Sequence, residues 1–145
     1  IMIDAFETGV FNYDEDRKSL SNYHNLSHHG QRDDHLKQLE ITDLRQMQLL
    51  QQQMRLMKST QMTDESLLDQ TMLLFGSNMG NANTHTNTNL PILLAGGGFK
   101  HGQHRVFDRE KNTPLSNLFV SMLQNMTIET NRFGSSTGAL DGLQF

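Results

Sequence analysis

The chain of 145 residues contains no cysteine. This absence excludes disulfide bonds, thiolate metal sites and a cysteine nucleophile. Basic residues are also in deficit, because 12 Lys and Arg stand against 16 Asp and Glu, for a formal net charge of −4. Such a balance leaves no basic surface for phosphate groups, so we expect neither nucleic acid nor an anionic membrane as the main partner.

Long apolar runs are missing as well. The longest, Leu90–Ala95, has six residues and includes Pro91, whereas a membrane-spanning helix needs about 20 apolar residues. We therefore expect no membrane span, and no signal peptide is recognisable. Charged residues make up 19% of the chain, below the norm of about 25%. The composition predicts a chain that is neither strongly disordered nor rich in core.

Residues 33–58 form the longest periodic stretch. Apolar side chains recur there at steps of three and four, which predicts an amphipathic helix with Asp33 and Asp34 at its start and Lys58 at its end. The members of this stripe are Leu36, Leu39, Leu44, Met47, Leu50, Met54 and Met57. A coiled coil is the rival interpretation, but Asp43 and Gln46 interrupt the pattern and leave under two heptads. We therefore favour a surface helix lying on a core, with a glutamine-rich outer face.

Two apolar segments, 71–75 and 90–95, read as fully buried strands. A second helix is predicted over 114–126, with Thr113 as its N-cap and Pro114 at its first position. A short turn is expected from Thr63 to Asp69, with Thr63 as its N-cap, and a short apolar element at Ile1–Phe6. The order of helix, strand, loop, strand and helix predicts an α/β fold with parallel strands. Two strands cannot cover both helices, so we expect other strands, from a preceding segment or another chain, to complete the sheet.

Histidines supply the strongest chemical signal. His24 and His28 are four apart and share a face on a helical turn, a spacing at which two imidazoles can hold one transition metal, whereas His29 points elsewhere. His85 lies in the polar loop 76–89 after the first strand, where open α/β sheets bind ligands. The alternatives are a solvated histidine-rich loop and a loop that hydrogen-bonds only to itself.

The other candidate site residues give weaker evidence of function. The glycines at 96–98 lack both the Lys-Ser/Thr pair of a P-loop and the G-x-G-x-x-G spacing, so they predict a structural turn. His101 and His104 are either substrate contacts or ordinary surface residues. No serine lies in a G-x-S-x-G elbow, so a serine-hydrolase triad is unsupported.

The segment His24-Asn25-Leu26-Ser27-His28-His29 reproduces a His-x-x-Ser-His-His signature. With it, the chain resembles the bacterial family of uncharacterised proteins named for that motif (HXXSHH), from about His24 to Leu143. Further segments are similar in order and spacing: 67–71, 74–81, 89–98, 102–104, 113–118 and 133–138.

The resemblance implies a fold and a location. The family is similar to the alkaline phosphatase and sulfatase superfamily, and its members are several times longer. Residues 1–145 would then be a single C-terminal segment of a larger alkaline phosphatase-like domain, an α/β parallel-sheet sandwich with flanking helices that is incomplete in this chain. An export signal in family members implies a secreted or periplasmic protein.

The resemblance also implies a metal site. By position, His24, His28 and His85 would hold one divalent metal, with zinc as the first choice. Asn78 and Met79 stand where the superfamily has an Asp-His pair, and they are poor ligands for a second metal. Asn78 and His104 are the substrate-binding candidates, for a small anionic ester or a glycan. The nucleophile of the superfamily comes from a segment that this chain does not contain, so no catalytic residue is named.

Two functions follow. The first is a metal-dependent hydrolase of phosphate or sulfate esters, and the second is a non-catalytic binding or structural protein with a degenerate hydrolase fold. The retained histidines favour the first, and Asn78 and Met79 favour the second. A third, weaker option is an interaction module that uses the glutamine-rich helix.

Overall fold

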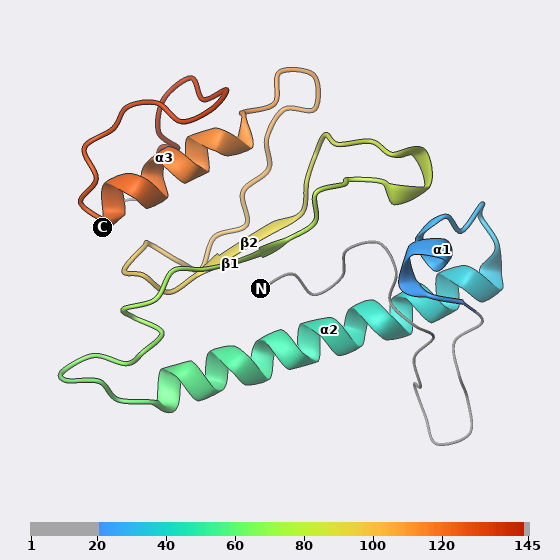
Figure 1. Cartoon of the computed structure of the whole chain (residues 1–145), viewed down its shortest axis with the longest axis horizontal. Coiled ribbons are helices and arrows are strands. Elements are labelled where there is room, and N and C mark those ends of the chain that lie inside the picture. Colours follow the sequence, from blue (N-terminus) through green and yellow to red (C-terminus); the bar gives the residue numbers. More distant parts are fainter. Residues whose placement is uncertain (1–20, 144–145) are drawn as a thin grey trace. The chain divides into compact units, whose positions relative to one another are not determined.

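A computed structural model describes residues 21–143 (Figure 1). These residues fall into two compact units. The first unit comprises residues 21–54 and 79–87, and the second comprises 55–78 and 88–143. The apolar element expected at Ile1–Phe6 lies outside the described residues. Within them the fold is mixed α/β, with elements in the order α1 (Tyr23–Ser27), α2 (Asp33–Ser59), β1 (Leu73–Gly76), η1 (Ala82–Thr84, a 3₁₀ turn), β2 (Ile92–Ala95) and α3 (Leu115–Asn125). No helix in this part of the chain has the length and apolar character to cross a membrane.

Helix α2 confirms the periodicity of residues 33–58. Acidic residues occupy its first turn and Lys58 its last turn, as the helix dipole favours. The predicted stripe is covered unevenly, since Met57 is buried and Leu50 is half-buried, while Leu44 is 58% exposed. The helix is therefore a surface helix that leaves part of its apolar side uncovered.

Strands β1 and β2 pair antiparallel, with Leu73 opposite Ala95 and Gly76 opposite Ile92. The prediction of parallel strands is wrong for this pair. A parallel pair needs a crossover that carries the chain back to the starting edge, whereas the connection 77–91 holds only one 3₁₀ turn and returns directly. The backbone N–H of Ser77 donates to the carbonyl of Pro91 at the base of this connection.

The expectation of fully buried strands is also wrong. Leu74 and Leu93 are 37% and 36% exposed, and exposure alternates along β1. The sheet of the described residues has only these two strands, so each strand has one open edge. A parallel-sheet sandwich is not formed by residues 21–143 on their own.

Helix α3 lies where the second amphipathic pattern predicts it. Its cap differs from the prediction, because Pro114 occupies the N-cap position with ψ of 134° and no side chain caps the helix. Thr113 is therefore not the cap. The missing cap is consistent with proline, whose ring fixes φ but which has no side-chain acceptor.

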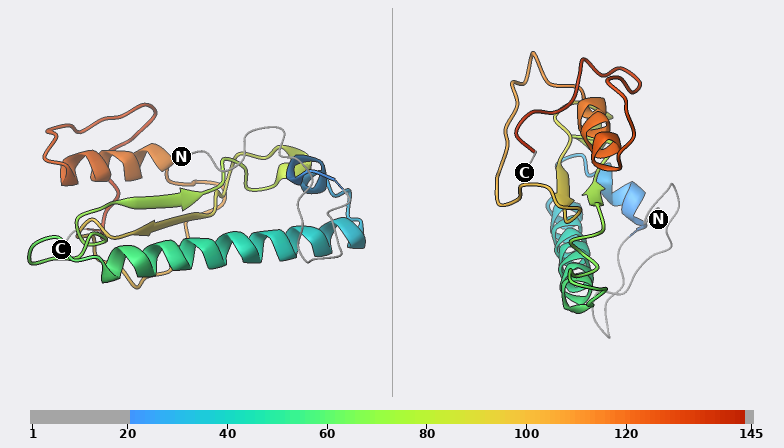
Figure 2. Two further views of the ribbon diagram at one scale, coloured as in Figure 1. Left: turned by 60° about the horizontal axis from the view of Figure 1, so that its bottom comes forward. Right: turned by 90° about the vertical axis from the view of Figure 1, so that its left-hand side faces the viewer.

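The core of the second unit surrounds α3. Val120 is fully buried, and Leu118 is 6% exposed. The C-terminal segment folds back along this helix (Figure 2). It is attached by polar contacts, because Asn117 Oδ1 accepts from the backbone N–H of Thr137 at 2.9 Å, and Ser121 Oγ accepts from that of Leu140 at 2.8 Å. Buried polar side chains on α3 thus satisfy a loop backbone that an apolar face could not.

Candidate functional site

The first two histidines of the candidate site are positioned by α1. Asn22 caps this helix, because its side-chain oxygen accepts from the backbone N–H of Asn25 at 2.8 Å. Leu26 is fully buried and anchors the turn. His24 and His28 then project from the same face, with ring centroids 4.9 Å apart and planes at 62°. This arrangement is the one that the spacing of four predicts.

The third histidine comes from the loop 80–86. His85 follows the 3₁₀ turn η1 and adopts a left-handed backbone conformation, with φ 55° and ψ 31°. Few residues other than glycine adopt this conformation, so it requires support from the neighbouring structure. Asn81 supplies this support. Its side chain caps η1, and its backbone N–H and carbonyl both hydrogen-bond to the backbone of Thr86, which closes the loop. The left-handed residue ends the 3₁₀ turn and sets the direction of the imidazole.

The structure brings His85 against His28. Their Nε2 atoms are 3.2 Å apart and their ring centroids 4.8 Å apart, in an edge-to-face arrangement. A second link joins the same two segments, because the backbone N–H of Gly30 donates to Asn83 Oδ1 at 3.0 Å. Both segments belong to the first unit. The cluster is thus built from two turns that are 57 residues apart in sequence.

The separation of the two Nε2 atoms bears on metal binding. With metal–nitrogen bonds of about 2.0–2.1 Å, a separation of 3.2 Å corresponds to an N–metal–N angle of about 100°, close to tetrahedral. Without a metal, the same separation suits a hydrogen bond in which one ring donates its Nε2–H and the other accepts. Across residues 21–143, however, no group of three or more His, Asp or Glu side chains is arranged to hold a metal as it stands. The Nε2 separation suits either a shared metal or a direct hydrogen bond, and a third metal ligand would require another side chain to turn.

His24 is the nearest candidate for that third ligand, since its ring lies against that of His28. His29 is not, because its Nδ1 accepts from the backbone N–H of Gln31 at 3.0 Å. The structure thereby decides which of the two adjacent histidines, His28 or His29, faces His85.

The two substrate-binding candidates lie in the second unit. Asn78 is exposed just beyond β1, and His104 is exposed in the irregular segment before α3. Neither belongs to the unit that contains the histidine cluster. Their role in binding remains a prediction.

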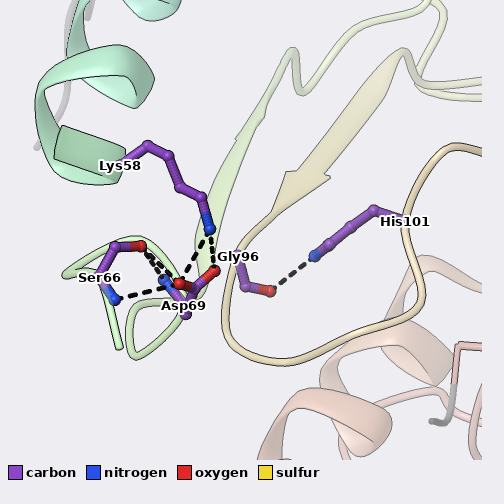
Figure 3. A network of polar contacts seen from close by, with 5 residues as sticks. All are labelled: Lys58, Ser66, Asp69, Gly96 and His101. Atoms are coloured by element: carbon purple, nitrogen blue, oxygen red, sulfur yellow. Dashed lines mark hydrogen bonds and ion pairs between the residues drawn. The ribbon is translucent and has the colours of Figure 1, made fainter. Parts of the chain in front are cut away.

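A polar network in the second unit joins Lys58, Ser66 and Asp69 (Figure 3). The sequence predicted the turn that carries Asp69 but not these contacts. Asp69 accepts from Lys58 Nζ at 2.8 and 2.9 Å and from Ser66 Oγ at 2.6 Å, so the bond from Lys58, with help from Ser66, lowers the pKa of Asp69 to about 2. The cap of the expected 63–69 turn is therefore the Ser66–Asp69 pair and not Thr63. A Ser-x-x-Asp spacing is the sequence signal that could have located it.

The glycine turn 96–98 is structural, as predicted. All three glycines have positive φ. His101 Nε2 donates to the carbonyl of Gly96 at 2.9 Å, which places the ring against the turn (Figure 3). This contact gives His101 a structural role.

Comparison of the chain with models of protein families, with curated proteins and with solved structures found no match. The resemblance to the HXXSHH family therefore stays a prediction.

Proposed function

We propose that His28 and His85, with His24 as the third ligand, bind one divalent metal, and that zinc is the preferred ion. The observation that carries this proposal is the 3.2 Å approach of the two Nε2 atoms from turns far apart in sequence. His24 is half-buried beside His28, on the same face of α1. A rotation of its side chain would bring a third nitrogen toward the pair, since its ring lies 4.9 Å from that of His28 in an edge-to-face contact.

The chemistry of three imidazoles supports a catalytic use. A zinc ion held by three protein ligands keeps an open position, where it polarises an ester oxygen and lowers the pKa of bound water. We therefore propose that the chain is the metal-holding part of a secreted or periplasmic hydrolase of phosphate or sulfate esters, of alkaline phosphatase-like type. The histidines would hold and orient the ion, and the substrate would be a small anionic ester or a glycan.

The open edges of β1 and β2 support a second part of this proposal. A two-stranded sheet is marginal in water, and three or more strands are usually needed for stability. We propose that further strands, from the rest of the domain or from another chain, complete this sheet. Leu74 and Leu93 point to opposite faces of the sheet, so layers packed on both faces of the widened sheet would cover them.

A non-catalytic binding protein is the second candidate. It is favoured by Asn78 and Met79, which offer no carboxylate or imidazole where a second metal would need one. In that case zinc would have a structural role, fastening the loop 80–86 to α1.

Zinc titration of the whole chain tests the metal site, followed by calorimetry and elemental analysis. We expect one zinc per chain, and a loss of affinity of roughly 100-fold or more in His28→Ala and His85→Ala, because each removes a direct ligand. His29→Ala is the matched control, since its ring contacts its own loop. No bound zinc, or equal losses in the control, would refute the site.

Hydrolysis is tested separately in the zinc-loaded full-length protein, with aryl phosphate and aryl sulfate substrates. Turnover that is lost in His85→Ala supports the hydrolase. Stoichiometric zinc without turnover supports the non-catalytic candidate.

A further inference from the structure

Helix α2 presents an apolar face that the described residues leave uncovered. Leu36, Leu44 and Met47 are 36%, 58% and 41% exposed. At about 100° per residue, these three side chains lie within an arc of about 80° on the helix, and the same arc also contains Glu40 and Gln51. Monomeric proteins seldom leave an aligned row of large apolar side chains in water, so the row is a candidate contact surface.

The charges of α2 are divided between its two halves. Residues 33–43 contain Asp33, Asp34, Glu40 and Asp43 against one lysine, for a net charge of −3. Residues 44–59 contain Arg45, Arg55 and Lys58 with no acidic residue, for a net charge of +3. Within the chain Asp34 already pairs with Arg32 and Lys58 with Asp69. The remaining charges still divide into an acidic first half and a basic second half, so the helix is self-complementary only when two copies run in opposite directions.

We infer that the chain forms a homodimer through the antiparallel pairing of two α2 helices. Leu44 and Met47 flank the midpoint of the helix, so a two-fold axis there sets Leu44 of each copy beside Met47 of the other. The same axis sets the acidic half of each helix along the basic half of its partner. A parallel pair would align like charges over the whole length, which opposes it. The contact is isologous and closes on itself, as in most homodimers.

This inference is independent of the metal site, because it uses no residue of the histidine cluster. It gives a role to the uneven covering of the helix stripe. Residues turned toward the rest of the chain, such as Met57, are buried, while those of the contact face remain exposed until the second copy covers them.

Sedimentation analysis of the whole chain tests the dimer. We expect a monomer–dimer equilibrium that Leu44→Lys shifts toward monomer by roughly 100-fold, because each copy would bury a charge at the centre of the contact. Leu49→Lys is the matched control, since Leu49 is 60% exposed on another side of α2 and gains the same charge. A chain that is monomeric at every concentration, or equal effects of the two substitutions, would overturn the inference.

Cross-linking tests the direction of pairing. Because the chain has no native cysteine, only the introduced cysteines can form a disulfide. An equimolar mixture of Leu36→Cys and Arg55→Cys chains should form the mixed disulfide on oxidation, because antiparallel pairing sets these positions near each other. Each variant alone should cross-link poorly. Efficient disulfide formation by Leu36→Cys alone would show parallel pairing and contradict the charge argument.

Discussion

The substitution Gly96→Ala probes the turn that ends β2 and carries the contact with His101. Gly96 has a φ of +69°, and a Cβ atom there would lie closer than 3.0 Å to the backbone carbonyl oxygens of Leu68 and Thr71. Backbone oxygens cannot rotate away as a flexible side chain can. The whole turn would therefore have to move, and the bond from Gly97 N–H to the carbonyl of Leu68 would move with it.

Gly102 supplies the matched control. It has a φ of +82° in the same unit, but a Cβ atom there would meet nothing within 4 Å. In both variants the left-handed conformation of alanine lowers the free energy of unfolding by about 1–2 kcal/mol. In both, the stiffer unfolded chain raises it again by about 0.4–1 kcal/mol. Only Gly96→Ala adds steric overlap, which costs roughly 1–3 kcal/mol in packed structure. We expect its loss of stability to exceed that of Gly102→Ala by about 2 kcal/mol.

Urea unfolding, followed by far-ultraviolet circular dichroism, measures this difference. With a denaturant slope of about 1–3 kcal/mol/M, the midpoint of Gly96→Ala should lie roughly 1 M below that of Gly102→Ala. If the two midpoints agree within about 0.3 M, the steric argument is wrong, and the turn has more room than the structure shows.

Three further predictions concern single contacts. Because its bonded carboxylate has a pKa of about 2, below the usual value of 3.8, Asp69 stabilises the fold above pH 4 and ceases to do so toward pH 2. The gap in melting temperature between the native chain and Asp69→Asn should therefore close over that range, and a constant gap would contradict the assignment. Asn83→Ala removes the acceptor of the Gly30 N–H and should weaken zinc binding roughly tenfold in the titration, whereas Asn87→Ala should not. Leu26→Ala opens a cavity under α1 and should cost about 2–5 kcal/mol in urea unfolding, and a cost near zero would show that α1 is not anchored there.

Local patterns predicted the elements well. The periodicity of residues 33–58 matches α2 to within one residue at its end, and α3 lies inside the predicted range. His24 and His28 share a face because one turn of helix sets the direction of side chains four apart. These features depend on neighbours in sequence, which is why a sequence pattern can reveal them.

Capping was less predictable. Thr113 and Thr63 each had the right chemistry for an N-cap, yet Pro114 occupies one cap position and the Ser66–Asp69 pair closes the other turn. A cap depends on one backbone dihedral angle, and several polar residues within reach compete for it.

By itself, the sequence determined where α2, α3 and the two strands lie, that the chain holds no cysteine chemistry, and that His24 and His28 would share a face on a helical turn. Only the tertiary structure decided that β1 and β2 run antiparallel, because pairing direction depends on the path of the loop between them. It also decided that His85 meets His28 rather than His29. That contact depends on the left-handed turn at His85 and on Asn83, which tie together segments that no local periodicity can relate.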